Sequence, residues 1–247
     1  MQSVAAVMTK LKGLGTEQTR KIYVRHGAVP KKVLGVSVAD MKATEKSIRK
    51  ELGKGHEAER QRLALGLYAT GIYDAMYLAG MLADGAKMTV DELRAWARGS
   101  GGMSMIAEYT VPWVAVENAA GRELALEWIG RGGEFVAASG WCTYSGLLST
   151  KPDAELDLHE IKALLKRVTE GIHKAANRER YTMNGFVIAV GSYVRPLEKE
   201  AKAAATKIGA VSVEMGETAC KVPDAAAYIA KTEAAGKAGV KKKTIRC

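Results

Sequence analysis

Apolar residues recur along this chain with the 3.6-residue period of an α-helix, whereas strict alternation with a period of two is hard to find. The clearest stripe is formed by six residues, Leu158, Ile161, Leu164, Leu165, Val168 and Ile172. Lys162, Lys166 and Glu170 share the opposite face of the same helix. This periodicity predicts an all-α fold.

Capping residues indicate where the helices begin. Thr89 and Glu92 form a T-x-x-E capping box, and Asp157 is a suitable N-cap for the helix that carries the stripe. Similar signals predict further helices at about 2–12, 15–26, 38–52, 57–69, 73–83, 104–118, 121–129, 134–149, 177–194, 197–208 and 224–235. The glycine-containing segment 210–223 breaks the helical pattern.

Two stretches, Phe135–Thr150 and Tyr181–Val194, carry no charged residue, so we expect their helices to be buried on all sides. Many short helices around such inner helices favour an α-solenoid of degenerate repeats over a four-helix bundle, whose helices would be fewer and longer. We expect one repeat domain over residues 1–247, with a basic tail at 236–247.

The cellular compartment is indicated by the cysteines and by the missing targeting signals. Cys142, Cys220 and Cys247 are an odd number at wide spacing, unlike a secreted disulfide framework or a zinc ribbon. Lys10 and Lys12 interrupt what would be the apolar core of a signal peptide. No uncharged run reaches the roughly 20 residues of a membrane span. We expect a cytoplasmic protein without a membrane segment.

The net charge of +10 is spread unevenly. Residues 1–62 hold 14 Lys and Arg against 6 Asp and Glu, which is +8, whereas residues 63–194 sum to −3 and residues 195–247 to +5. Basic ends around a slightly acidic middle are typical of a protein that contacts a long polyanion at two places.

Enzyme signatures are mostly absent, since the chain has no HExxH, GxSxG, P-loop or complete GxGxxG sequence. The four histidines lie far apart, so we predict no metal, and no motif indicates a cofactor. The most informative stretch contains Trp113 and Glu117, which share one face if both are helical. Either Trp113 packs in the core while Glu117 caps a helix or forms a salt bridge, or the indole and the carboxylate together stabilise a cation.

Four blocks of sequence carry a resemblance to a known family. They are LYATGIYD at 67–74, the Trp113-x-x-x-Glu117 segment, MNGFVIAVGSY at 183–193 and TACKVPDAAAYI at 218–229. Together they resemble the AlkD-like DNA alkylation repair proteins, which are built of HEAT-like helical repeats. The resemblance implies a right-handed α-solenoid, or α-α superhelix, whose concave face holds duplex DNA.

The same resemblance implies a monofunctional DNA glycosylase that hydrolyses the N-glycosidic bond of cationic N3- and N7-alkylpurines. Glu117 would occupy the place of the catalytic Asp, and Trp113 that of the first aromatic wall. The family's Arg and second Trp fall near Ser139 and Ile188. Ser139 has no charge to hold a phosphate, and Ile188 has no ring for a cation–π contact. Trp141 or Tyr144 could supply a ring from a neighbouring turn, or serve as core residues.

We predict phosphate contacts from six basic residues, Arg178, Arg180, Lys241, Lys242, Lys243 and Arg246. The expected partner is double-stranded alkylated DNA, bound by a monomer near the nucleoid. Two alternatives remain open: a non-catalytic binder of damaged or branched DNA, and a helical-repeat scaffold for acidic proteins.

Overall fold

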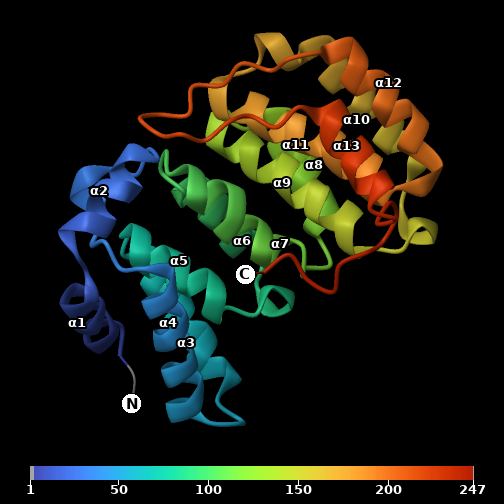
Figure 1. Ribbon diagram of the computed structural model, residues 1–247. Coiled ribbons are helices and arrows are strands. Elements are labelled where there is room, and N and C mark those ends of the chain that lie inside the picture. The colour runs from blue at the N-terminus through green and yellow to red at the C-terminus, as the bar shows by residue number, and fades with distance from the viewer. Residues whose placement is uncertain (1–2, 247) are drawn as a thin grey trace. The chain divides into compact units, whose positions relative to one another are not determined.

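A computed structural model describes residues 3–246, and helices with short connections make up this part of the chain (Figure 1). The α-helices are α1 Val4–Leu14, α2 Glu17–Arg25, α3 Val38–Leu52, α4 Glu57–Ala69, α5 Tyr73–Leu82, α6 Val90–Gly99, α7 Val111–Ala115, α8 Gly121–Arg131, α9 Glu134–Thr150, α10 Leu158–Gly171, α11 Asn177–Tyr193, α12 Glu198–Ile208 and α13 Ala225–Ala234. No strand occurs among the described residues. The all-α prediction is confirmed, while the predicted helix start at residue 2, and Cys247, lie outside the described residues.

The described residues group into two compact units. Unit 1 runs to Ala120 and includes 216–218 and Arg246, and unit 2 consists of 121–215 and 219–245. The expectation of a single repeat domain over residues 1–247 stays a prediction.

Capping decides where several helices start. The Thr89 hydroxyl accepts from the Glu92 N–H at 3.2 Å, and the Glu92 carboxylate accepts from the Thr89 N–H at 2.8 Å, which confirms the predicted box. Asp157 accepts from the Glu160 N–H at 3.0 Å as the N-cap of α10.

The stretches 135–150 and 181–193, which carry no charge, lie in α9 and α11, the inner helices of unit 2. No residue of α9 is exposed, and within 181–194 only Gly185 is. α8 and α11 pack against α9, and α12 and α13 pack against α11. Neighbours on several sides explain why these two stretches need no charged face, as their composition predicts.

In unit 1, α5 holds the corresponding position, because every residue of it except Met81 is buried. Tyr73 and Tyr77 are both buried, in agreement with a packing role. Asp74 is fully buried, and its carboxylate accepts hydrogen bonds from the N–H groups of Leu34 at 2.7 Å, Gly35 at 3.2 Å and Val36 at 2.7 Å. Burial raises the pKa of the Asp74 carboxyl, and the three backbone donors oppose that rise.

Asp74→Asn is expected to lower the free energy of unfolding by about 2 kcal/mol, because one amide oxygen cannot accept from all three donors and the new NH₂ group faces an N–H. Urea denaturation measures the change. Asp91→Asn is the matched control, since the Asp91 side chain is 93% exposed. Equal stability of the two variants would contradict the anchoring role of Asp74.

The helix predicted at about 104–118 is not one regular α-helix, and it ends three residues early. Pro112 has no N–H for an intrahelical bond, and the chain forms a π-helical turn at Ile106–Thr110, closed by a bond from the Val111 N–H to the Ile106 carbonyl. α7 then ends at Ala115. Beyond the end of α7, the Asn118 side chain donates to the carbonyls of Gly85 at 2.7 Å and Met88 at 2.8 Å. Glu117 therefore lies in a turn and not on a helical face beside Trp113.

Candidate functional site

The candidate site of unit 1 is a cavity of about 370 Å³. It is lined by Lys42, Glu45, Lys46, Met81, Trp113 and Arg246. Trp113 is only 2% exposed, and its ring meets Tyr77 edge to face with 5.0 Å between centroids. The indole is held by packing and contributes to one wall of the cavity.

Both carboxylate oxygens of Glu117 are engaged. Arg246 Nε donates to Oε1 at 2.6 Å, and Arg246 Nη2 donates to Oε2. Oε2 also accepts from the Gly85 N–H at 3.1 Å. The side chains are 35% exposed for Glu117 and 19% for Arg246, so the pair is partly screened from water. This two-bond arrangement is the strong form of an Arg–carboxylate pair.

Arginines also satisfy the carbonyls at the C-terminal end of α5. Arg246 donates to Gly80 O at 2.6 Å and to Ala83 O at 2.9 Å. Arg49 donates to Met81 O at 2.9 Å, and Arg60 donates to Leu82 O at 3.2 Å. These carbonyls have no intrahelical partner and carry the negative end of the helix dipole, which favours cations. The C-terminal end of α5 therefore favours positive charge.

The pairing determines what Glu117 can do. A carboxylate stabilises a developing sugar cation through its uncompensated negative charge. A guanidinium within hydrogen-bond distance of both oxygens cancels much of that charge. With Arg246 in place, the Glu117 carboxylate serves as the hydrogen-bond acceptor for the arginine.

The two other predicted ring contacts lie in the core of unit 2. Trp141 is fully buried against Phe186, with 5.1 Å between centroids, and Tyr144 is 3% exposed. The Tyr144 hydroxyl donates to Glu160 at 2.5 Å, and burial, ahead of that bond, raises its pKa. The assignment of Trp141 and Tyr144 as substrate-binding residues has no support from this geometry, because neither ring presents a surface to a ligand.

The residues near the family's Arg and second Trp are core residues as well. The Ser139 hydroxyl donates to Phe135 O at 3.0 Å within its own helix, and Ser139 is fully buried. Ile188 is 9% exposed and belongs to the apolar cluster of unit 2.

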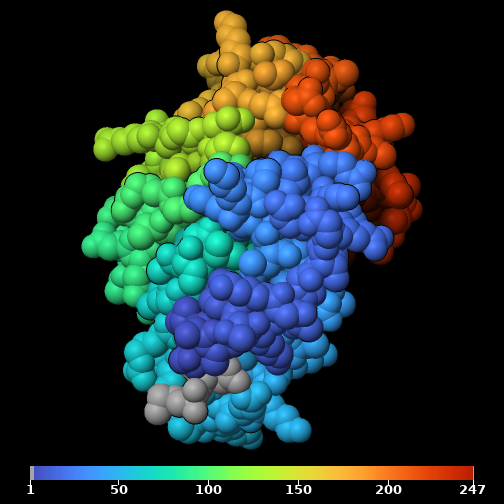
Figure 2. All heavy atoms as spheres, turned by 90° about the vertical axis from the view of Figure 1, so that its left-hand side faces the viewer, coloured from blue at the N-terminus to red at the C-terminus, as the bar shows by residue number. Residues whose placement is uncertain are grey.

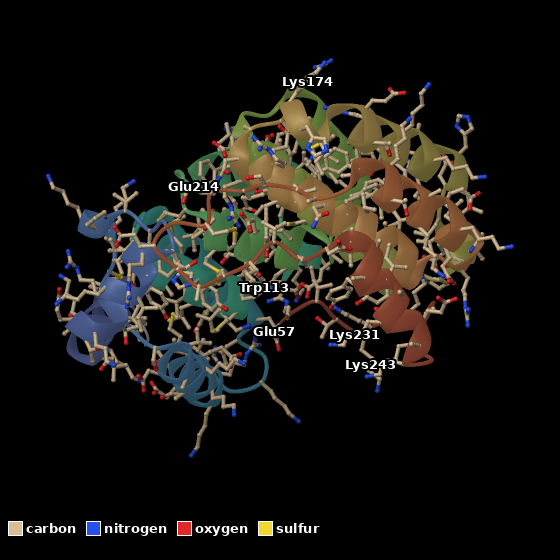
Figure 3. The ribbon with its side chains drawn as sticks, turned by 45° about the horizontal axis from the view of Figure 1, so that its top comes forward. Glu57, Trp113, Lys174, Glu214, Lys231 and Lys243 are labelled. Atoms are coloured by element: carbon tan, nitrogen blue, oxygen red, sulfur yellow. The ribbon has the colours of Figure 1, made fainter. Side chains whose placement is uncertain are left out.

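Among the predicted phosphate contacts, several are engaged inside the protein. Arg178 lies over the Tyr181 ring at 4.4 Å, and Arg180 donates to the carbonyls of Ser212 and Ala175. Lys241 pairs with Asp153 at 2.8 Å. Lys242 and Lys243 are exposed, and Figure 3 shows the Lys243 side chain directed outward.

Sequence reasoning missed a basic surface on unit 1. A second cavity, of about 450 Å³, is lined by Arg20, Lys21, Val24, Arg25, Pro30 and Glu217. α2, which supplies four of these residues, buries none of its side chains. In Figure 2 the dark-blue residues of α1 and α2 face the viewer. The +8 charge of residues 1–62 was the available signal, because α2 presents its cations outward.

Other site types are not indicated by the described residues. They contain no group of three or more His, Cys, Asp or Glu side chains that could hold a metal ion. None of their helices is long and apolar enough to cross a membrane.

The chain was compared with known proteins. The model of the DNA alkylation repair enzyme family matches residues 7–178. Two uncharacterised proteins, from Listeria innocua and Listeria monocytogenes, are each 32% identical over 225 residues, which is 90% of this chain and 94% of theirs. One solved structure, described as a new family related to the HEAT-like repeat DNA glycosylases with affinity for branched DNA structures, has a TM-score of 0.86 at 32% identity, with 100% of both chains covered.

Proposed function

Because this chain belongs to the DNA alkylation repair enzyme family and has the HEAT-like repeat fold, we propose that it binds branched DNA without excising bases. The observation that carries the proposal is the pairing of Glu117 with Arg246, which occupies both oxygens of the carboxylate that would do the chemistry. The related structure with affinity for branched DNA supports the choice of ligand. A protein with this function would act on chromosomal DNA in the cytoplasm.

The residues near the positions of the family's Arg and second Trp also support binding without excision. The family's Arg and second Trp are replaced near Ser139 and Ile188, and these two side chains are buried in unit 2. A buried serine cannot bind a phosphate, and an isoleucine has no aromatic ring to contact a cationic base.

The exposed cations supply the affinity. Lys21 and Arg25 stand four residues apart on α2, and Lys242 and Lys243 are exposed in the tail. Such side chains bind phosphates whatever the base sequence, and each contact releases counterions from the DNA. Branched DNA brings several phosphate backbones close together, so it offers dispersed cations more contacts than a linear duplex does.

Fluorescence anisotropy with a four-way junction and a linear duplex of the same arm sequence tests the proposal. The junction should bind roughly tenfold or more tightly, a difference of about 1.4 kcal/mol. Lys21→Glu/Arg25→Glu should weaken binding of both DNAs. Lys162→Glu/Lys166→Glu is the matched control, because it reverses the charge of two exposed lysines that stand four residues apart on α10.

Three results would count against the proposal. Equal affinity for junction and duplex would remove the preference for branched DNA. Equal losses in the two charge-reversal variants would show that only overall charge matters. Binding of neither DNA would favour the scaffold for acidic proteins.

A DNA glycosylase is the second candidate. Glu117 favours it, because a carboxylate is retained near Trp113 and its side chain remains 35% exposed. In that case Arg246 must leave before N3- or N7-alkylpurines are excised, and release of free base separates this function from binding alone.

A further inference from the structure

We propose that unit 1 contains a binding site for a guanidinium group, and that Arg246 is its displaceable occupant. The ligand class is a planar cation with several N–H donors, which in this structure the protein's own chain supplies. The site exists whether or not the protein binds DNA.

The acceptors match the shape of a guanidinium. Four oxygens receive its N–H groups: Oε1 and Oε2 of Glu117, Gly80 O and Ala83 O. Glu117 Oε1 accepts from Nε, whereas the other three oxygens accept from Nη1 and Nη2. A lysine ammonium has three donors on one atom and cannot reach acceptors spread around a plane. The arrangement selects for a guanidinium among the common protein cations.

The acceptors are held by the fold and not by Arg246 alone. The Gly85 N–H donates to Glu117 Oε2, and Asn118 ties the turn after α7 to Gly85 and Met88. Gly80 lies in the buried helix α5, and Ala83 follows directly after it as its C-cap. A site whose acceptors are already ordered loses less entropy when a ligand binds.

The occupant comes from a distant part of the chain and can leave without disrupting a helix. Arg246 lies 129 positions after Glu117, and no helix is assigned between Ala235 and Arg246. Its side chain is 19% exposed and also lines the 370 Å³ cavity with Trp113 and Met81. That cavity gives a small molecule access to the site.

Chemical rescue of Arg246→Ala tests the site. The variant should melt at a lower temperature than the wild type, and millimolar methylguanidinium should raise its melting temperature by roughly 2–4 °C. The wild type should respond much less, because the tethered Arg246 side chain competes with the added ligand. Methylammonium, which has the charge but not the planar donors, should have no effect. Adding Glu117→Gln to Arg246→Ala should abolish the rescue.

Equal responses in the wild type, Arg246→Ala and the double variant would overturn the proposal, as would an equal effect of methylammonium. If Arg246→Ala does not fold, Arg246→Lys replaces it. Methylguanidinium should then displace the lysine and shift the indole N–H resonance of Trp113. An unchanged resonance at concentrations up to tens of millimolar would also overturn the proposal.

Discussion

Replacing Trp141 by alanine is expected to lower the free energy of unfolding by about 3–5 kcal/mol, the usual cost of removing a large aromatic side chain from a core. Trp141 is fully buried, its ring lies against Phe186, and the Arg167 guanidinium is 5.9 Å from its centroid. Its indole N–H lies 3.4 Å from a Glu179 oxygen. Urea denaturation followed by circular dichroism measures the loss.

Trp141→Phe is the matched control for this prediction. It keeps an aromatic ring but loses the indole N–H and part of the volume, so it should cost clearly less than alanine. If Trp141 contacts substrate instead, Trp141→Ala should remain as stable as the wild type and lose DNA affinity. That outcome would restore the ligand role that its burial argues against.

Raising the salt concentration from 50 to 200 mM is expected to weaken DNA binding by about two orders of magnitude. If about four phosphates are neutralised, the logarithm of the binding constant falls with that of salt with a slope of about −3.6, which is roughly 150-fold over this range. Lys21, Arg25, Lys242 and Lys243 are exposed cations suited to these contacts. Anisotropy titrations at several salt concentrations measure the slope.

The variant Lys21→Glu/Arg25→Glu should reduce that slope by about two, because two phosphate contacts disappear. The α10 variant Lys162→Glu/Lys166→Glu should leave it nearly unchanged. A slope near zero in the wild type would mean that phosphate contacts do not supply the affinity, contrary to the role given to the exposed cations.

Most helices of this protein could be predicted from its sequence because their signals are local. The stripe from Leu158 to Ile172 and the cap at Asp157 lie within one element, and α10 is found there. The absence of charged residues from 135–150 in α9 and from 181–193 in α11 indicated burial for a similar reason, since a helical segment without charges needs neighbours on several sides.

The candidate site was predicted only in part because its decisive contact is not local. The sequence pointed to Trp113 and Glu117, but nothing near either residue indicates Arg246, which reaches Glu117 from the far end of the chain. The spacing of Trp113 and Glu117 gives a shared face only where one continuous helix carries both. The π-helical turn before Pro112 and the Asn118 contacts end that helix early and move Glu117 into a turn.

The charge pattern had a similar limit. It indicated basic ends correctly, but it could not separate cations that face water from those used inside the fold. Arg180 and Lys241 hold backbone carbonyls of their own unit, whereas Lys21 is exposed. This separation depends on tertiary packing.

The most direct test of binding without excision is base release from DNA that carries N7-methylguanine. Wild-type protein is incubated with this DNA under conditions in which anisotropy shows it bound, and free base is measured by chromatography. We expect no release above spontaneous depurination, because Arg246 occupies the Glu117 carboxylate. Release well above that background, lost in Glu117→Gln, would contradict it and identify the protein as a DNA glycosylase.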